Sequence, residues 1–449
     1  MAFDLKLDSL ELTNFHKFAR YFIDFDESMT VLVGDNGSGK SSILDAAAVS
    51  LSTVVSQLSH QPAIRLSSSD ARLSFYDMEG FTDRQEQYPV TISARGRVGE
   101  GPQDEHAAWS YVLKSSDDNA ANLPSQQLWH PLRNCTERIQ SGDSSLVLPV
   151  AAYYGTSRLH AHTQSGRNRR SKPFSRQDGY SNALDATIGT NQMLDWFFKM
   201  TAQNVQRSQS LRPAGESKLF VAVRTAIEQC FQSITGSKRV NVTYNLDTDD
   251  LDIEYFDDDN EVQRMSLSLL SDGYRTTLSM VADIAYRMAL LNPALGEKVL
   301  SETPGVVLID EVDLHLHPLW QARILGDLRT IFPKVQFIVT THAPTVISSV
   351  GKQHIRLLNN NEKAQVPSVE VYGSDVGRVL ISVMGAPERP EGVQRKFDEF
   401  YNALGAGDFD QARTLLDELV KTVGNDDTDV VGAQTALSLE EADARYAAD

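Results

Sequence analysis

The most specific chemical signal in the sequence is a short glycine-rich segment. Gly34-Asp35-Asn36-Gly37-Ser38-Gly39-Lys40-Ser41 matches the spacing G-x-x-x-x-G-K-[ST] at every position. Glycines let successive backbone N–H groups wrap around phosphate oxygens without a Cβ clash. A lysine at this place reaches the β- and γ-phosphates of a nucleotide, and the hydroxyl after it ligates Mg²⁺. Together with Ser42, these residues are the predicted nucleotide-binding set, with ATP and Mg²⁺ as expected ligands; a chance match in a turn is the alternative.

Two carboxylates follow a second apolar run, Val306 to Ile309. This run is short and rich in β-branched residues, and it ends in Asp310-Glu311, the pattern called Walker B. We expect Asp310 to join Ser41 in the Mg²⁺ shell. Glu311 would orient or deprotonate the water that attacks the terminal phosphate. Two solvated carboxylates at a strand end are the alternative, which the intact phosphate loop disfavours.

A histidine follows a third apolar run. The stretch "VQFIVTTHAP" reads as a strand that ends just before His342. Because ligands of parallel α/β sheets bind at the carboxyl ends of the strands, we predict that His342 contacts the γ-phosphate as a second catalytic residue. His315 and His317 could suggest a metal site with Glu311 or Asp313. Their spacing lacks a third cluster of ligands, so a packing or dimer-contact role is favoured.

The candidate site residues follow predicted strands, so neighbouring strands that end side by side must bring them together. Thr30 to Val33 reads as a buried strand before the glycine-rich loop, and the pattern from Ser42 onward is helical. Apolar runs such as Val306 to Ile309 are typical of buried parallel strands. The sequence therefore predicts the α/β class.

The composition limits which partners and which cellular compartment are expected for this protein. The 449 residues contain 42 Lys+Arg and 60 Asp+Glu, a net charge of −18, which disfavours nonspecific nucleic-acid binding without excluding a local basic groove. Two cysteines, Cys135 and Cys230, permit neither a disulfide framework nor a zinc pattern and indicate reduced thiols. The charged N-terminus does not resemble a secretory signal, and no apolar run reaches the length of a spanning helix. We expect a cytoplasmic protein with no membrane partner.

The segment Leu270-Ser271-Asp272-Gly273-Tyr274-Arg275 lies upstream of Walker B and before a helical pattern. It resembles the signature motif of ABC ATPases, usually L-S-G-G-Q, and the order of phosphate loop, insertion, signature, Walker B and switch histidine is the ABC order. The resemblance implies that Ser271, Asp272 and Gly273 act in trans, on nucleotide bound by another subunit. Asp272 and Tyr274 depart from the usual motif, and slow hydrolysis is the alternative that these two residues favour.

The resemblance can be narrowed within the ABC class. The start "LDSLELTNFHKFARYFIDF" reads as two antiparallel strands and resembles RecF/SMC-type heads. "DEVDLHLHPLWQARIL", "TTHAP", "LSDGYR" and "AAYYGTSRL" are similar to the PtuA ATPases of Septu anti-phage systems and their retron-associated relatives. That resemblance implies head-to-head homo-oligomers and a separate HNH nuclease partner of the PtuB type. The resemblance also allows a contact between this complex and DNA or RNA.

The predicted organisation is an ABC ATPase head with a helical insertion and a C-terminal helical extension. The head combines a mixed sheet around the phosphate loop with an antiparallel β layer. Its halves are expected at residues 1–156 and 239–380, separated by a basic loop and helical insertion at 157–238. The basic run 157–176 has two interpretations. It contacts nucleic-acid phosphates or lines an oligomer interface, or it is a solvated loop without a binding role. Residues 381–449 form the extension, which is expected to contact a partner or another subunit.

Three functions remain in view at this point. The first is an ATPase that controls a defence nuclease through ATP-dependent head dimerisation. The second is a RecF-like repair ATPase that acts directly on DNA. The third is a nucleotide-sensing scaffold with slow hydrolysis.

Overall fold

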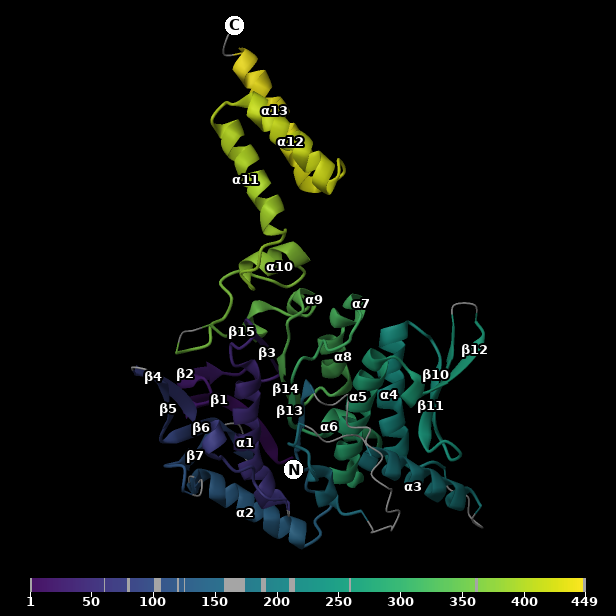
Figure 1. Cartoon of the computed structure of the whole chain (residues 1–449). Helices are drawn as coiled ribbons and strands as arrows, with labels where there is room; N and C mark the ends of the chain where they lie inside the picture. The colour runs from purple at the N-terminus through teal and green to yellow at the C-terminus, as the bar shows by residue number, and fades with distance from the viewer. Residues whose placement is uncertain are drawn as a thin grey trace. The chain divides into compact units, whose positions relative to one another are not determined.

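The computed structural model describes residues 2–59, 61–78, 81–100, 106–118, 121–124, 126–156, 174–186, 191–209, 215–257, 260–359 and 362–446. The chain divides into two compact units, Met1–Asp375 and Val376–Asp449 (Figure 1). Every residue predicted to bind or hydrolyse nucleotide lies in the first unit.

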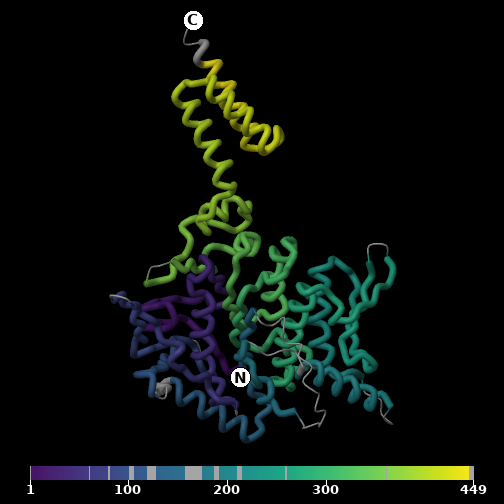
Figure 2. The backbone as a smooth tube through the Cα atoms, viewed as in Figure 1, coloured from purple at the N-terminus to yellow at the C-terminus, as the bar shows by residue number. Residues whose placement is uncertain are grey.

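A five-stranded parallel sheet forms the centre of this unit. Its order is β15-β3-β14-β13-β9, with bounds Ile355–Leu357, Met29–Val33, Val335–Thr340, Gly305–Ile309 and Val150–Tyr154. All four pairings in this sheet are parallel. Strands β3, β13 and β14 are buried along their whole length, as their continuous apolar runs predict. Figure 2 shows the purple backbone of β3 beside the green backbone of β14, so segments far apart in sequence are neighbouring strands inside this sheet.

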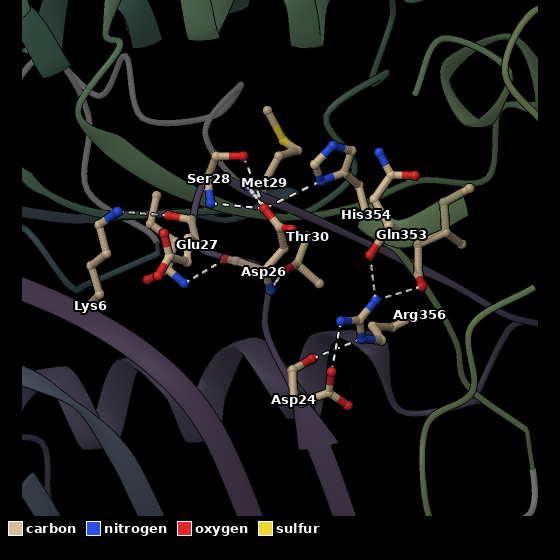
Figure 3. A network of polar contacts seen from close by, with 12 residues as sticks. Lys6, Asp24, Asp26, Glu27, Ser28, Met29, Thr30, Gln353, His354 and Arg356 are labelled. Carbon is tan, nitrogen blue, oxygen red and sulfur yellow. Dashed lines mark hydrogen bonds and ion pairs between the residues drawn. The ribbon is translucent and has the colours of Figure 1, made fainter. Parts of the chain in front are cut away.

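A polar network fixes the N-terminal end of β3, opposite the end that leads into the glycine-rich loop (Figure 3). The carboxylate of Asp26 accepts hydrogen bonds from the backbone N–H groups of Ser28 and Met29, at 2.9 and 3.1 Å. Arg356, the middle residue of β15, donates to the carboxylate of Asp24 at 2.7 Å. The turn into β3 is therefore tied to the neighbouring strand, which fixes the register of the strand that leads to the phosphate loop.

The second sheet is antiparallel, with the order β2-β1-β6-β7-β8. Its strands are Phe18–Asp24, Asp4–Phe15, Val90–Gly99, His106–Leu113 and Ala121–Pro124. The expected pair of N-terminal strands is confirmed as β1 and β2. A separate two-stranded ribbon is formed by β4 (Arg72–Met78) and β5 (Phe81–Gln87).

Helix α1 (Lys40–Leu58) packs against strands of both sheets. The indole of Trp109 in β7 donates to the carbonyl of Ser50 at 3.0 Å and anchors the helix. Among the described helices, α1 alone is long and apolar enough to cross a membrane, with a mean hydropathy of 1.2. Because 72% of that apolar window is buried, its hydrophobicity is that of a core helix.

Helices and a third sheet complete the first unit. The helical pattern expected after the signature segment is confirmed as helix α5 (Asp272–Leu291), which is almost fully buried and packs against α4 (Lys218–Thr235) and β9. The third sheet has three antiparallel strands, β10 (Val240–Asn245), β11 (Asp250–Phe256) and β12 (Val262–Ser266). The remaining helices of this unit are α2 (Gln126–Gln140), α3 (Asn191–Ser208), α6 (Val299–Glu302), α7 (Pro318–Gln321), α8 (Ile324–Ile331) and α9 (Pro344–Ile347). Short 3₁₀ turns occur at η1 (Ser68–Asp70), η3 (Arg176–Tyr180), η4 (Leu267–Leu269), η5 (Pro293–Lys298) and η6 (Lys352–His354).

The second unit is helical and has its own core. It contains α10 (Val376–Ser382), α11 (Glu391–Gly405), α12 (Phe409–Val423) and α13 (Thr428–Tyr446). Phe397, Phe400, Leu404, Leu416 and Leu419 are among its buried side chains. The α/β fold class with a C-terminal helical extension is confirmed. The four-part division of the chain stays a prediction.

Candidate functional site

The phosphate loop joins β3 to α1 with the geometry that its glycines allow. Gly37 and Gly39 have φ angles of 75° and 97°, in the left-handed region that favours glycine. A Cβ on Gly39 would lie 2.4 Å from the ring of Phe18 in β2. The loop is therefore pressed against the antiparallel sheet, and only glycine fits at that point.

Lys40 begins α1 and is 7% exposed. Its ammonium donates to the carbonyls of Gly34 and Asp35, both at 2.9 Å. Burial lowers the pKa of Lys40, and the nearby carboxylates, Asp310 first, partly oppose that shift. Ser38 Oγ in the same loop is buried and has no hydrogen-bond partner in the described part of the chain. A buried ammonium, a helix N-terminus and an unpartnered hydroxyl fit the phosphates of a nucleotide.

Asp310 connects the two motifs. It follows β13, and its carboxylate accepts a hydrogen bond from Ser41 Oγ at 2.9 Å and another from Thr340 Oγ1 at 2.6 Å. The donor set of one hydroxyl and one carboxylate, both oxygen ligands, fits Mg²⁺. The predicted pair of metal ligands thus meets at one point, although its members are 269 positions apart in the sequence.

Glu311 and His342 lie at the same carboxyl edge of the sheet. Glu311 has a φ of 47°, unusual for a residue with a long side chain, and its backbone N–H donates to Thr340 Oγ1 at 2.7 Å. His342 follows β14 by two residues and is half-buried. Both predicted catalytic residues are therefore placed beside the phosphate loop, and their roles stay predictions.

The signature segment forms the start of α5. Ser271 is the N-cap residue, but its side chain makes no capping hydrogen bond, contrary to the usual role of a serine there. Asp272 forms an ion pair with Arg275 at 2.5 Å. A Cβ on Gly273 would lie 2.3 Å from the carbonyl oxygen of His315, so the signature turn contacts the loop after Walker B within one chain.

Tyr274, the second departure from the usual motif, has a packing role. Its ring lies 4.1 Å from that of Trp320 in α7 and 5.8 Å from that of Phe231 in α4. His317 caps α7, accepting a hydrogen bond from Leu319 N at 3.4 Å. No group of three or more possible metal ligands of the His, Cys, Asp or Glu type occurs among the described residues.

Sequence reasoning missed His16, at the tip of the β1–β2 hairpin. Its Nδ1 lies 2.9 Å from Ser42 Oγ, and its Nε2 lies 3.3 Å from Asp70 Oδ1. The ring of Phe15 stacks on that of His16 at 4.0 Å. Next to it, Lys17 Nζ donates to the carbonyl of Gly37 at 2.8 Å. The only available signal was a histidine beside the strand turn, which becomes informative once β1 and β2 are known to approach the loop.

A cavity of about 460 Å³ opens beside His16. Its apolar wall comes from α1, and its polar groups include Asp45, Asp70 and Asp185. Its volume is in the range of small-molecule sites. Burial raises the pKa of Asp45, and the hydrogen bond from Tyr153, at 3.1 Å, partly opposes the shift.

A buried polar cluster joins the end of β9 to α5. Tyr154 Oη donates to Asp283 at 2.8 Å, and Arg287 Nε donates to the same carboxylate at 2.7 Å. Arg287 also donates to the carbonyls of Gly179 and Ser181, at 3.1 and 3.0 Å. This cluster fixes the signature helix against the strand beside Walker B.

The basic run 157–176 falls mainly outside the described residues, which resume at 174. Arg158, Arg167, Arg169, Arg170 and Lys172 are all outside. Arg176 is described and donates to the carbonyls of Leu291, Asp143 and Leu146 at 2.7, 2.9 and 2.5 Å. Its guanidinium thus has a structural role, and nucleic-acid contact by the rest of the run stays a prediction.

Comparison with known families agrees with this geometry. The sequence model described as "AAA domain" matches residues 9–234, half of the chain. The chain belongs to the AAA-domain family. A second AAA-domain model, described with the AbiEii toxin of type IV toxin–antitoxin systems, matches residues 194–348 of this AAA-domain protein. Family membership and the assembled motifs make it a nucleotide-binding ATPase.

Two relatives of this AAA-domain ATPase align with it over most of its length. It is 24% identical to the "Retron Vc95 probable ATPase" of Vibrio cholerae serotype O1 biovar El Tor, covering 86% of this chain and 80% of the relative. It is 26% identical to the "Retron Ec83 probable ATPase" of Escherichia coli, covering 95% and 85%. The "Septu protein PtuA" of Bacillus thuringiensis is 32% identical over 35% of this chain and 40% of its own length. A solved SMC head bound to the C-winged helix domain of ScpA matches with a TM-score of 0.47 and 16% identity, covering 82% of this chain and 99% of that one.

Proposed function

We propose that this chain is the ATP-binding and ATP-hydrolysing subunit of a cytoplasmic anti-phage defence complex. The observation that carries the proposal is the 2.9 Å hydrogen bond between Ser41 Oγ and Asp310, which brings both expected Mg²⁺ ligands to the start of α1. The names of the retron and Septu relatives support the setting in defence.

The predicted site residues support the following chemistry. The phosphate loop and Lys40 bind the β- and γ-phosphates, while Ser41 and Asp310 would hold Mg²⁺. A bound Mg²⁺ ion neutralises phosphate charge and orients the terminal phosphoryl group. Glu311 orients the attacking water and accepts its proton, and His342 contacts the γ-phosphate.

Two copies of the head close around the nucleotide in this proposal. The signature of one copy faces the γ-phosphate bound by the other copy, through Ser271, Asp272 and Gly273. The signature is therefore functional only in an oligomer. Nucleotide-dependent closure then controls a separate HNH nuclease of the PtuB type, which acts on DNA or RNA. The resemblance to Septu ATPases supports the partner.

A pair of variants tests the ATPase assignment. Lys40→Ala is expected to weaken nucleotide binding at least about 10-fold, equivalent to about 1.4 kcal/mol. Glu311→Gln is expected to bind ATP normally, to lose turnover and to accumulate as a closed dimer, measured by the mass of the assembly with and without ATP. Normal hydrolysis by Glu311→Gln would remove Glu311 from its role as the base.

Affinity purification of the natively expressed protein tests the partner. A co-purifying nuclease is expected, and a chain ending at Pro390 is expected to lose it while still binding ATP. Retention of the nuclease by the shortened chain would exclude helices α11 to α13 as the contact. Turnover stimulated by DNA without any partner would instead favour a repair ATPase.

A further inference from the structure

Tyr154 connects two motif-bearing parts of the ATPase through a single residue. It is the last residue of β9 and pairs with Ile309, the last residue of β13. Its backbone carbonyl accepts a hydrogen bond from the backbone N–H of Asp310 at 2.8 Å. Its hydroxyl donates to the carboxylate of Asp283 in α5, also at 2.8 Å. The main chain of Tyr154 therefore contacts the Walker B segment, and its side chain contacts the signature helix.

The two tyrosines that end β9 reach helices on opposite faces of the sheet. Successive side chains of a strand alternate between the two faces. Tyr153, the residue before Tyr154, donates its hydroxyl to Asp45 in α1 at 3.1 Å. One hydroxyl thus contacts the helix that follows the phosphate loop, and the next contacts the helix that begins with the signature. The pair offers two matched side chains that differ in the motif to which they are connected.

The carboxylate that accepts from Tyr154 is itself held in place. Arg287 Nε donates to the same oxygen of Asp283 at 2.7 Å, and both charged residues are buried. Burial raises the pKa of Tyr154 well above its usual value, and the neighbouring Asp283 carboxylate raises it further. The hydroxyl therefore stays protonated and acts as a donor. Bulk water has little access to this contact and does not replace it.

The free edge of β9 is closed by the segment 179–186. β9 is the last strand in the order of the parallel sheet, and the backbone N–H of Tyr153 donates to the carbonyl of Ala183 at 2.7 Å. A Cβ on Gly155 would lie 2.7 Å from the Cβ of Ala186. The same segment accepts two hydrogen bonds from the Arg287 guanidinium. The end of β9, this segment and α5 thus form one packed junction around the Tyr154 hydroxyl.

The position of Asp283 along α5 determines what the contact controls. Asp283 lies about three helical turns after Asp272, the first residue of α5. A continuous helix moves as a stiff rod, so a rotation at Asp283 displaces the signature residues at its N-terminal end. A hydrogen bond at this point therefore restricts the direction in which the signature is presented.

We propose that Tyr154 is a positioning residue of the ATPase reaction, whose hydroxyl aligns the signature helix of its own chain with the nucleotide bound by a second copy. Tyr154 acts through Asp283 and α5 and takes no part in the chemistry itself. This inference rests on the proposed arrangement of the signature in trans. It adds that the strand beside Walker B determines how one copy presents its signature to the other.

Removal of the hydroxyl alone tests this role in the full chain. Tyr154→Phe keeps the ring and the backbone carbonyl, so we expect wild-type affinity for MgADP and a wild-type KM for MgATP. Its kcat is expected to fall about 10-fold, the effect of one lost hydrogen bond to a charged group. Tyr153→Phe, the matched control on the other face, is expected to keep the wild-type kcat. Wild-type kcat in Tyr154→Phe, an equal loss in both variants or a loss of MgADP binding would each overturn the inference.

Mixed assemblies test whether the effect reaches the other copy. A Lys40→Ala chain binds nucleotide weakly but has an intact signature, so an excess of it should restore most of the turnover of Tyr154→Phe. Ser271→Ala mixed with the same Lys40→Ala chain is the reference for a defect of the signature alone. Recovery of Ser271→Ala without recovery of Tyr154→Phe would overturn the inference. Absence of recovery in both mixtures would instead overturn the proposed arrangement in trans.

Discussion

At the scale of single residues, Thr340 shows how one hydroxyl aligns both halves of Walker B. It donates to the Asp310 carboxylate at 2.6 Å and accepts from the Glu311 backbone N–H at 2.7 Å. The side chain is fully buried, so neither contact can be replaced by bulk water. Thr340 therefore holds a predicted metal ligand and a predicted catalytic residue in fixed relation.

Replacing Thr340 with Val should remove both hydrogen bonds at nearly constant volume. We expect the free energy of unfolding to fall by about 1–3 kcal/mol, since buried polar groups are left unsatisfied. We also expect weaker Mg²⁺-dependent ATP hydrolysis. Thr340→Ser keeps the hydroxyl and serves as the control in denaturant titration and in turnover assays. Equal losses in both variants would assign Thr340 a packing role.

At the scale of elements, α5 is held by a buried ion pair as well as by its apolar faces. Asp283 and Arg287 are each 8% exposed at the side chain and lie one helical turn apart. Breaking a buried pair by removing one partner costs more than a surface pair contributes, because the remaining charge stays buried. The signature helix is therefore sensitive to a change far from the signature itself.

Arg287→Met is expected to lower the free energy of unfolding by about 3–5 kcal/mol. The matched control is Arg275→Met on the same helix, whose partner Asp272 is 58% exposed. An exposed pair contributes only about 0–1 kcal/mol, so this variant should unfold close to wild type. Chemical denaturation of both variants measures the difference. Similar decreases in the free energy of unfolding of the two variants would mean that the buried pair contributes no more to stability than the exposed pair.

The sequence predicts the motif-bearing elements well because their signals are local. β3, β13 and β14 are apolar runs that end at chemically distinctive residues, so their position and the site at their ends could be inferred together. The contacts of His16 with Ser42 and Asp70 could not, because they depend on how a hairpin from another sheet approaches α1. Strand β12 could not be predicted either, because its side chains are exposed and carry little apolar pattern.

At the scale of the whole molecule, the division at Asp375 separates the nucleotide site from the C-terminal helices. The second unit buries Phe400, Leu419 and Val430 in a core of its own. A unit with its own core can in principle fold alone. The ATPase chemistry should therefore belong to the first unit alone.

A chain ending at Asp375 is expected to bind MgADP with the affinity of the full chain. Its thermal unfolding should lack any transition that belongs to the helical unit. Calorimetry of both chains measures binding and unfolding in the same samples, with Lys40→Ala in the short chain as the non-binding control. A short chain that is folded but does not bind would show that the second unit completes the site.

The left-handed backbone of Glu311 has a consequence for how stability is distributed in this protein. A residue with a Cβ in that conformation costs about 1–2 kcal/mol, which glycine does not incur. Glu311→Gly should therefore be more stable than Glu311→Ala by about 1 kcal/mol, although both lack the carboxylate. Thermal unfolding of the two variants measures that difference, and equal midpoints would show that the backbone is relaxed. Selection for thermal robustness alone would favour glycine at this position, and the predicted catalytic role of Glu311 would explain why a glutamate is present instead.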